Sequence, residues 1–391
     1  MISDPVPSNG SRHRSLRQRR TGLDIPIILL LLMLPVSLWA SFDIRWSAPK
    51  LAGLLAGMAI YYLTVAYVAG HRRLRLALGA FLLLGVIVAA VGLVGTGWLR
   101  KNELLWRVTQ RLPHWIDGLP GAARGFHPNE VAGILLWFLP PQIALLFWFL
   151  RRRPFWSWQV VACCCAVLLE GCTLALTQSR GAMLGLVVGV MAMGALVNRR
   201  ARNLAALAVV SGLAAWVAGG PAATTTALVE GLPQRFFGAP NWDFRLSVWR
   251  AALWGIVDFP FTGIGLGAFR RAAGLLYPLE HVHRIEDLGH AHNGFLQAAL
   301  DLGVVGLVAY AAIWLQSARM LWLTNRQTEG CPKALAVGFW GSVVSSLVYN
   351  LTDTIALGAI GGLPWWFLLG LIAGLYRLSV QDGLGDGATT S

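Results

Sequence analysis

The stretch Gly289-His290-Ala291-His292-Asn293-Gly294-Phe295-Leu296-Gln297 opens an apolar run that extends to Leu315. The run from Phe295 to Leu315 carries one charged residue, Asp301, and is long enough to cross a bilayer. Polar, titratable side chains therefore stand where the chain enters lipid. In so hydrophobic a chain, such a position is either a water-exposed loop or a reaction site, and we favour a reaction site.

Composition indicates a polytopic membrane protein of the all-α class. Of 391 residues, 56% are hydrophobic and 13% are charged, whereas soluble domains carry about 25% charged residues. The net charge of +14 comes from Lys and Arg gathered in short loops between apolar runs, which is an orientation signal in membrane proteins. That distribution argues against a nucleic-acid partner. The five cysteines have no metal-ligand spacing with histidine, so we expect no metal and no other cofactor.

Apolar runs predict ten membrane spans that alternate with basic loops. The runs lie at 25–42, 51–69, 76–96, 130–150, 156–177, 182–197, 204–219, 294–316, 334–352 and 362–377. The basic connections are 71–75, 151–153, 198–202 and 319–333. With the Arg-rich N-terminus inside, every basic loop falls on the cytoplasmic side of the membrane. Both termini are then cytoplasmic, and the first run is a retained span rather than a removed signal peptide.

The spans divide the chain into five segments. We expect a disordered basic tail over 1–22, spans one to seven over 23–219, a long external loop over 220–293, spans eight to ten over 294–378 and a cytoplasmic tail over 379–391. The external loop contains a predicted helix, 241–257, whose apolar face carries Leu246, Trp249, Leu253 and Val257. The glycines within 263–267 predict a turn after that helix.

Side chains able to do chemistry gather on the predicted external face. His290 and His292 precede the eighth span, Arg180 lies in a tight turn between the fifth and sixth spans, and Arg245 lies on the predicted helix. Other polar groups at span ends on this face are His127, Asn129, Glu130 and Asp353. An Arg in a short external turn is either a snorkelling side chain or an anion clamp, since its planar fork binds phosphate bidentately.

His292 is either a hydrogen-bonded helix cap or a general base, since a histidine has an ordinary pKa of about 6.5. On a straight helix that begins near His292, Gly303 and Gly306 share its face and Asp301 points the opposite way. Small residues below His292 let another helix approach, so this face should look into the bundle. Glu170, inside the fifth span, is either part of an ion pathway or a satisfied bundle residue.

Five stretches resemble the O-antigen ligase and polymerase family. The central one is His292-Asn293, nine residues, Gly303, two residues and Gly306. The others are Gly125–Glu130 with its Pro-Asn element, Ser179-Arg180-Gly181, Asp243–Trp249, and Asp258–Gly265 with its Pro-x-x-Gly-x-Gly break. They occur in the family's order and together cover roughly residues 120–360.

The resemblance implies a metal-independent, inverting membrane glycosyltransferase. Its donor would be a glycan linked to undecaprenyl pyrophosphate, held among membrane lipids, and its acceptor a lipid core or another saccharide. On that reading His292 deprotonates the acceptor hydroxyl, while Arg180 and Arg245 bind the donor pyrophosphate. The substrate-binding or supporting residues that the resemblance implies are His290, Asn293, Asn129 and Asp353.

Two classes of function remain open at this point. The enzyme class covers an O-antigen ligase, a surface-polysaccharide polymerase and a protein-glycosylating relative, which share their chemistry and differ in acceptor. The alternative is a transporter or flippase of lipid-linked glycans, which would keep polar sites near the membrane midplane, often in repeated halves. The polar groups here cluster at one face, and no internal repeat is visible. The sequence therefore favours the enzyme and leaves its acceptor undecided.

Overall fold

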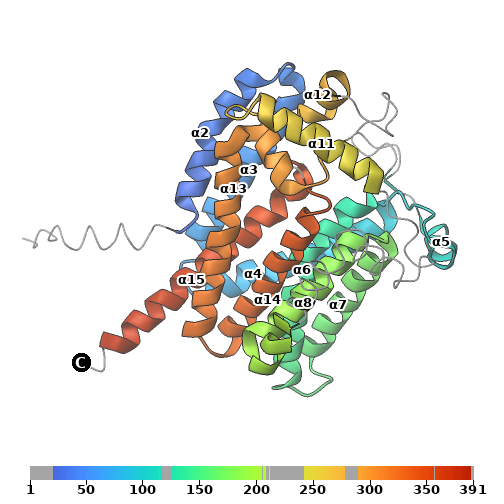
Figure 1. Ribbon diagram of the computed structural model, residues 1–391. Coiled ribbons are helices and arrows are strands. Elements are labelled where there is room, and N and C mark those ends of the chain that lie inside the picture. Colours follow the sequence, from blue (N-terminus) through green and yellow to red (C-terminus); the bar gives the residue numbers. More distant parts are fainter. Residues whose placement is uncertain are drawn as a thin grey trace, which may run out of the picture.

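The computed structural model of the chain is a bundle of helices (Figure 1). It describes residues 21–113, 115–116, 125–204, 206–207, 211, 242–277, 289–355 and 357–388. These residues form no β-strand, which confirms the predicted all-α membrane architecture. The predicted basic tail up to residue 20 and most of the predicted seventh span lie outside the described residues.

Within the described part of the chain, eight helices are long and apolar enough to cross a membrane. They are α3 (Ile44–Tyr67), α4 (His71–Gly95), α6 (Pro128–Leu150), α7 (Trp158–Thr177), α8 (Arg180–Val197), α13 (Gly294–Gln327), α14 (Gly330–Asn350) and α15 (Leu363–Ala388), the last preceded by the 3-10 turn η1 (Ile360–Gly362). The apolar helix α2 (Asp24–Ala40) has 17 residues, at the short end of the spanning range of about 17 to 25. The shorter helices are α5 (Glu103–Thr109), α11 (Trp242–Asp258) and α12 (Phe269–Leu276).

Several helices continue beyond the apolar runs that predicted them. α13 runs on to Gln327 and α14 begins at Gly330, so most of the predicted basic connection 319–333 is helical. α15 likewise extends through the predicted tail to Ala388. Leu, Met, Arg and Gln are strong helix formers, so a helix can outlast the hydrophobic stretch that enters lipid.

α14 is the central helix that positions the site. It packs against α6, α8 and α13. Glycines on α8 allow a close contact with α14. An added Cβ at Gly185 would lie 2.5 Å from the Ser345 carbonyl oxygen. Small residues allow two membrane helices to approach in this way. The approach brings the start of α8, with Arg180, beside the loop that follows α14.

α13 is broken at Gly303, which has φ 68° and ψ −174°. The segment after α11 fills the break: the Ile264 amide donates to the Leu300 carbonyl at 2.7 Å, and the Val304 amide donates to the Pro260 carbonyl at 2.8 Å. A Cβ on Gly303 would lie 2.3 Å from the Phe261 carbonyl oxygen, so only glycine fits. The freed backbone groups are thus paired by protein rather than left in lipid.

Because of this break, the prediction that Gly303 and Gly306 share a helix face with His292 is wrong. His292 lies before the N-cap of α13, and Gly303 does not continue the helical phase. Asp301 does not point away from the bundle either, since it is 1% exposed. Its Oδ1 accepts the Gly267 amide at 2.9 Å and the Gln297 amide at 2.8 Å, which ties the glycine turn to α13.

α11 lies across one end of the bundle, beside α12 (upper part of Figure 1). Its packing face consists of Val248, Ala251 and Ala252, each fully buried. The predicted apolar face points the other way, with Val257 74% exposed. Small residues on the packing face let α11 lie close to α13, while the larger apolar side chains remain available to lipid.

Glu170 is a fully buried residue of α7. The Gln142 side-chain amide on α6 donates to its Oε1 at 2.6 Å. An added Cβ on Gly85 of α4 would lie 2.5 Å from the same oxygen. The carboxyl group is thus enclosed by three packed helices, with Oε1 paired and Oε2 buried without a hydrogen-bond partner among the described residues.

Candidate active site

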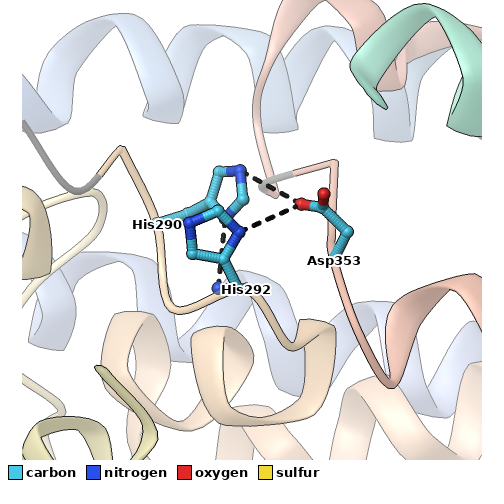
Figure 2. Close-up of side chains that lie close together, drawn as sticks. All are labelled: His290, His292 and Asp353. Atoms are coloured by element: carbon cyan, nitrogen blue, oxygen red, sulfur yellow. Dashed lines mark hydrogen bonds and ion pairs between the residues drawn. The ribbon is translucent and has the colours of Figure 1, made fainter. Parts of the chain in front are cut away.

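Three connections meet at the end of the bundle that carries α11. They are the loop before α13, which holds His290 and His292, the loop after α14, which holds Asp353, and the start of α6, which holds Asn129. Figure 2 shows both imidazole rings directed at the Asp353 carboxylate, which comes from the opposite connection. Residues separated by about sixty positions in the chain are therefore neighbours in the fold.

Asp353 is the centre of this site. Its Oδ1 lies 3.5 Å from His290 Nε2 and 3.4 Å from His292 Nδ1. The Asn129 amide donates to its Oδ2 at 2.7 Å, and the Thr354 backbone amide donates to Oδ1 at 2.9 Å. Burial by itself raises the pKa of Asp353, but the interactions with His292 and His290 outweigh it and hold that pKa well below its usual range. The carboxylate is therefore ionised at neutral pH.

His290 has both ring nitrogens engaged. Its Nδ1 accepts the backbone amide of His292 at 3.1 Å, so the ring proton must be on Nε2, which faces Asp353. Burial lowers the pKa of His290 to about 4, against the opposing charge of Asp353. A neutral imidazole with this tautomer positions its neighbours and has no nitrogen left to accept a proton from a substrate.

His292 differs from His290 because, among the described residues, Nδ1 is its only ring nitrogen with a polar contact, the one to Asp353. Its Nδ1 lies against Asp353, and its side chain is 18% exposed. A proton on Nδ1, directed at the carboxylate, leaves the Nε2 lone pair available as a base. The rings of His292 and Phe244 are 5.5 Å apart and nearly edge to face, which limits the orientation of the imidazole.

Backbone strain occurs at two turns of the site. Gln178, with φ 55°, and His292, with φ 49°, are the two non-glycine residues of positive φ in the described part of the chain. Gln178 stands two positions before Arg180. Such backbone conformations cost free energy and collect at functional sites, where the surrounding structure enforces them.

The Arg180 turn rests on the Asp353 loop. An added Cβ on Gly181 would lie 2.5 Å from Thr352 Oγ1, so the Ser-Arg-Gly turn requires its glycine for this approach. Arg245 follows Phe244 on α11 and is half-buried. No salt bridge joins Arg245 to a carboxylate among the described residues.

Lys101, which precedes α5, lies close enough to Arg180 and Arg245 for their charges to act on it. Burial by the surrounding protein lowers the pKa of Lys101 first, and the positive charges of Arg180 and Arg245 lower it further, while Asp353 opposes them. The side chain of Lys101 nevertheless reaches solvent. The site therefore combines a histidine–carboxylate pair with a group of cations.

The fold brings together six of the seven predicted site residues, namely His292, His290, Asp353, Asn129, Arg180 and Arg245. The seventh, Asn293, has a structural role at the same place. Its Oδ1 caps α13 by accepting the amides of Phe295 and Leu296 at 3.0 and 3.1 Å, and its amide donates to the Leu351 carbonyl at 3.2 Å. Asn293 therefore holds the His292 loop at the start of α13, and its predicted role in substrate binding stays a prediction.

Two further residues of the site, His127 and Lys101, are absent from the predicted set. His127 caps α6, with its Nδ1 accepting the Asn129 amide at 3.3 Å, and its charge interacts with those of Asp353 and His292. The signal for His127 was its place beside Pro128 and Asn129 in a family-like stretch. Lys101 had no comparable signal, because only tertiary contacts bring it to Arg180.

His290, His292 and Asp353 are also the one group of potential metal ligands found among the described residues, with ligand atoms within 4.8 Å of one another. Two imidazoles and a carboxylate suit a zinc-like ion. The hydrogen bonds oppose such an ion, because metal binding at His290 Nε2 requires the proton on Nδ1, and Nδ1 already accepts the His292 amide. The residues therefore do not fit a metal in this arrangement.

Comparison with known proteins agrees with the motifs. Residues 163–311 match a model of the O-antigen ligase family. The matched region includes Arg180, Arg245, His290 and His292, whereas Asn129 and Asp353 lie outside it. A search of curated proteins finds no match to the chain.

Proposed function

We propose, from the membership of residues 163–311 in the O-antigen ligase family, that this multi-pass membrane protein is a glycosyltransferase. It transfers a glycan from undecaprenyl pyrophosphate to an acceptor hydroxyl at the outer face of the bacterial cytoplasmic membrane. The observation that carries the proposal is the pairing of His292 with the buried Asp353, close to the charges of Arg180 and Arg245. A base beside an anion-binding group is what displacement of a pyrophosphate requires.

The reaction proceeds by direct displacement. The acceptor oxygen attacks the anomeric carbon of the donor sugar and forms the new glycosidic bond. The proton of that hydroxyl passes to His292 Nε2, and the bond between the anomeric carbon and the pyrophosphate oxygen breaks. The bonding electrons leave with undecaprenyl pyrophosphate, whose added negative charge is stabilised by Arg180 and Arg245. One displacement inverts the configuration at the anomeric carbon.

The remaining polar groups support His292. Asp353 holds the Nδ1–H tautomer and stabilises the imidazolium that forms when Nε2 takes the proton. Asn129 and the Thr354 amide orient the carboxylate, and His290 fixes the second face of Oδ1. With two arginines for the pyrophosphate, this mechanism needs no metal ion.

Glycan transfer by the purified protein tests the proposal. The donor is a glycan on undecaprenyl pyrophosphate, with EDTA present, and core lipid and repeat-unit acceptors are offered in separate reactions. We expect transfer that survives EDTA and is lost in His292→Ala and in Arg180→Ala, while Arg100→Ala serves as a matched control at an exposed, ion-paired position. Full activity in His292→Ala would refute the base assignment, and loss of wild-type activity in EDTA would refute metal independence. The acceptor that is used separates a ligase from a polymerase.

A transporter or flippase of lipid-linked glycans is the second candidate, and the broken helix α13 is the observation that favours it. Discontinuous helices form substrate sites in transporters. Here the break is filled by residues 260–264, which weakens the comparison. Single cysteines at positions 180, 245 and 292 distinguish the two candidates. Labelling only from the outer face supports the enzyme, and labelling that alternates between the two faces supports transport.

A further inference from the structure

Arg100 and Lys101 are adjacent cations with different surroundings. Arg100 forms an ion pair with Glu103, in which its NH2 group lies 2.9 Å from Oε2. Lys101 has no salt bridge to a carboxylate among the described residues. The charge of Arg100 is therefore neutralised by a carboxylate. The charge of Lys101, which is the one near the site, is not neutralised among the described residues.

The segment that carries Lys101 is fixed on both sides. Trp98 and Asn102 are 8% and 9% exposed, and the Asn102 side chain caps α5 by accepting the Leu104 amide at 2.9 Å. The Gly97 amide donates to the Phe126 carbonyl at 3.0 Å, directly before His127. Lys101 is therefore presented from an anchored backbone rather than from a free loop.

The same segment is tied to the turn that holds Arg180. The Gln178 side-chain amide donates to the Leu99 carbonyl at 3.5 Å. Gln178 is itself 6% exposed and is one of the two strained non-glycine residues. A hydrogen bond thus spans the gap between the Lys101 segment and the turn that carries Arg180.

The charge balance around Lys101 indicates an anion. Among the described residues, Arg180, Arg245 and Asp353 are the groups whose charges act on Lys101, so three cations and one carboxylate lie near one another there. That carboxylate already accepts hydrogen bonds from Asn129 and Thr354 and contacts both histidines. Like charges held together raise the free energy of the folded protein unless a counter-charge binds. For Lys101, which has no carboxylate partner among the described residues, an anionic ligand supplies that counter-charge.

We propose that Lys101 is a third cation of the donor site and binds the pyrophosphate together with Arg180 and Arg245. This inference rests on the proposed function and extends it to a residue outside the family match. A lysine contributes a compact point charge, whereas the arginines contribute bidentate forks. Because the pyrophosphate is charged before the reaction as well as after it, Lys101 acts mainly on donor binding. Its removal should raise the KM for the donor more than it lowers kcat.

Kinetics of three variants of the full-length protein test the proposal. Lys101→Met removes the charge, Lys101→Arg keeps it, and Arg100→Met removes the neighbouring, ion-paired charge as a matched control. We expect Lys101→Met to raise the donor KM by about 10- to 100-fold, the range for a hydrogen bond to a charged group, with kcat within about threefold. Lys101→Arg should recover most of the affinity, and Arg100→Met should match wild type. Thermal unfolding of each variant checks that the fold is intact.

Binding of inorganic pyrophosphate provides a readout independent of transfer. Calorimetry on wild type and Lys101→Met should give a Kd that rises by a similar factor, and a weaker dependence of binding on salt in the variant. Equal pyrophosphate affinity in the two proteins, or equal effects of Lys101→Met and Arg100→Met, overturns the role of Lys101. A wild-type protein that binds pyrophosphate but transfers no glycan refutes the proposed function, and the calorimetric comparison then decides on Lys101 alone. A wild-type protein that binds no pyrophosphate refutes the role of Lys101 as well.

Discussion

Replacing Asp353 by Asn should slow transfer while leaving donor binding intact. The substitution keeps the size of the side chain and removes the negative charge that faces His292 Nδ1. An amide in this position also presents an NH2 group that can turn His292 to the other tautomer, with its proton on Nε2. Both effects weaken the base without touching the cations that hold the pyrophosphate.

The size of the effect follows from the geometry. Two unit charges at the 3.4 Å separation of His292 Nδ1 and Asp353 Oδ1 interact by about 5 kcal/mol at an effective dielectric constant of about 20. In the transition state the proton is only partly transferred, so about half of this, roughly 2 to 3 kcal/mol, is lost. That loss corresponds to a decrease in kcat of roughly 30- to 150-fold.

The assay is steady-state glycan transfer by wild type, Asp353→Asn, His292→Ala and the double variant. Because Asp353 acts through His292, Asp353→Asn should cause no additional loss in the His292→Ala background. The donor KM should remain within about threefold of wild type in Asp353→Asn. A single variant with wild-type kcat, or losses that multiply in the double variant, would refute the pairing of these two residues.

Two further predictions concern stability. The pKa of His290, lowered by burial to about 4, lies below the roughly 6.5 of an unfolded histidine, so the unfolded chain binds a proton that the folded protein excludes as pH falls. The free energy of unfolding should therefore decrease by up to about 3 kcal/mol between pH 6.5 and 4. The pH dependence of Tm should flatten in His290→Gln. If Tm in that variant depends on pH as it does in wild type, His290 is not the group responsible. Gly303→Ala should cost about 3 kcal/mol or more, because its Cβ meets the Phe261 carbonyl oxygen at 2.3 Å and its φ is 68°. Gly171→Ala, on an open face of α7, should leave Tm unchanged, and equal Tm values for the two variants would show that the break in α13 is not required.

Local sequence signals predicted most of the residues that the fold brings together, and one projection drawn from them, the straight-helix one, was wrong. The positions of His292, Arg180 and Arg245 followed from short stretches that keep their order along the chain. The capping of α13 by Asn293 did not follow from them, because a side chain before a helix caps that helix or meets a ligand according to what lies opposite it. The projection of Gly303 onto the His292 face failed for a related reason. Helical phase holds only while the backbone stays helical, and residues 260–264 replace α13 hydrogen bonds at the break.

The sequence by itself determined the membrane architecture, the approximate spans and the resemblance to the O-antigen ligase family, since these depend on hydrophobicity and spacing along the chain. Only the tertiary structure decided how the two histidines divide their roles. His290 contacts the His292 amide with one nitrogen and Asp353 with the other, whereas His292 has a polar contact at Nδ1 alone among the described residues. It also places Asp353 against both histidines, and it is the basis of our proposal that Lys101 acts together with the arginines. Burial, tautomer and charge depend on neighbours that lie up to 224 positions away in the chain, as Asn129 and Asp353 do, and packing of α6, α8, α13 and α14 makes them neighbours.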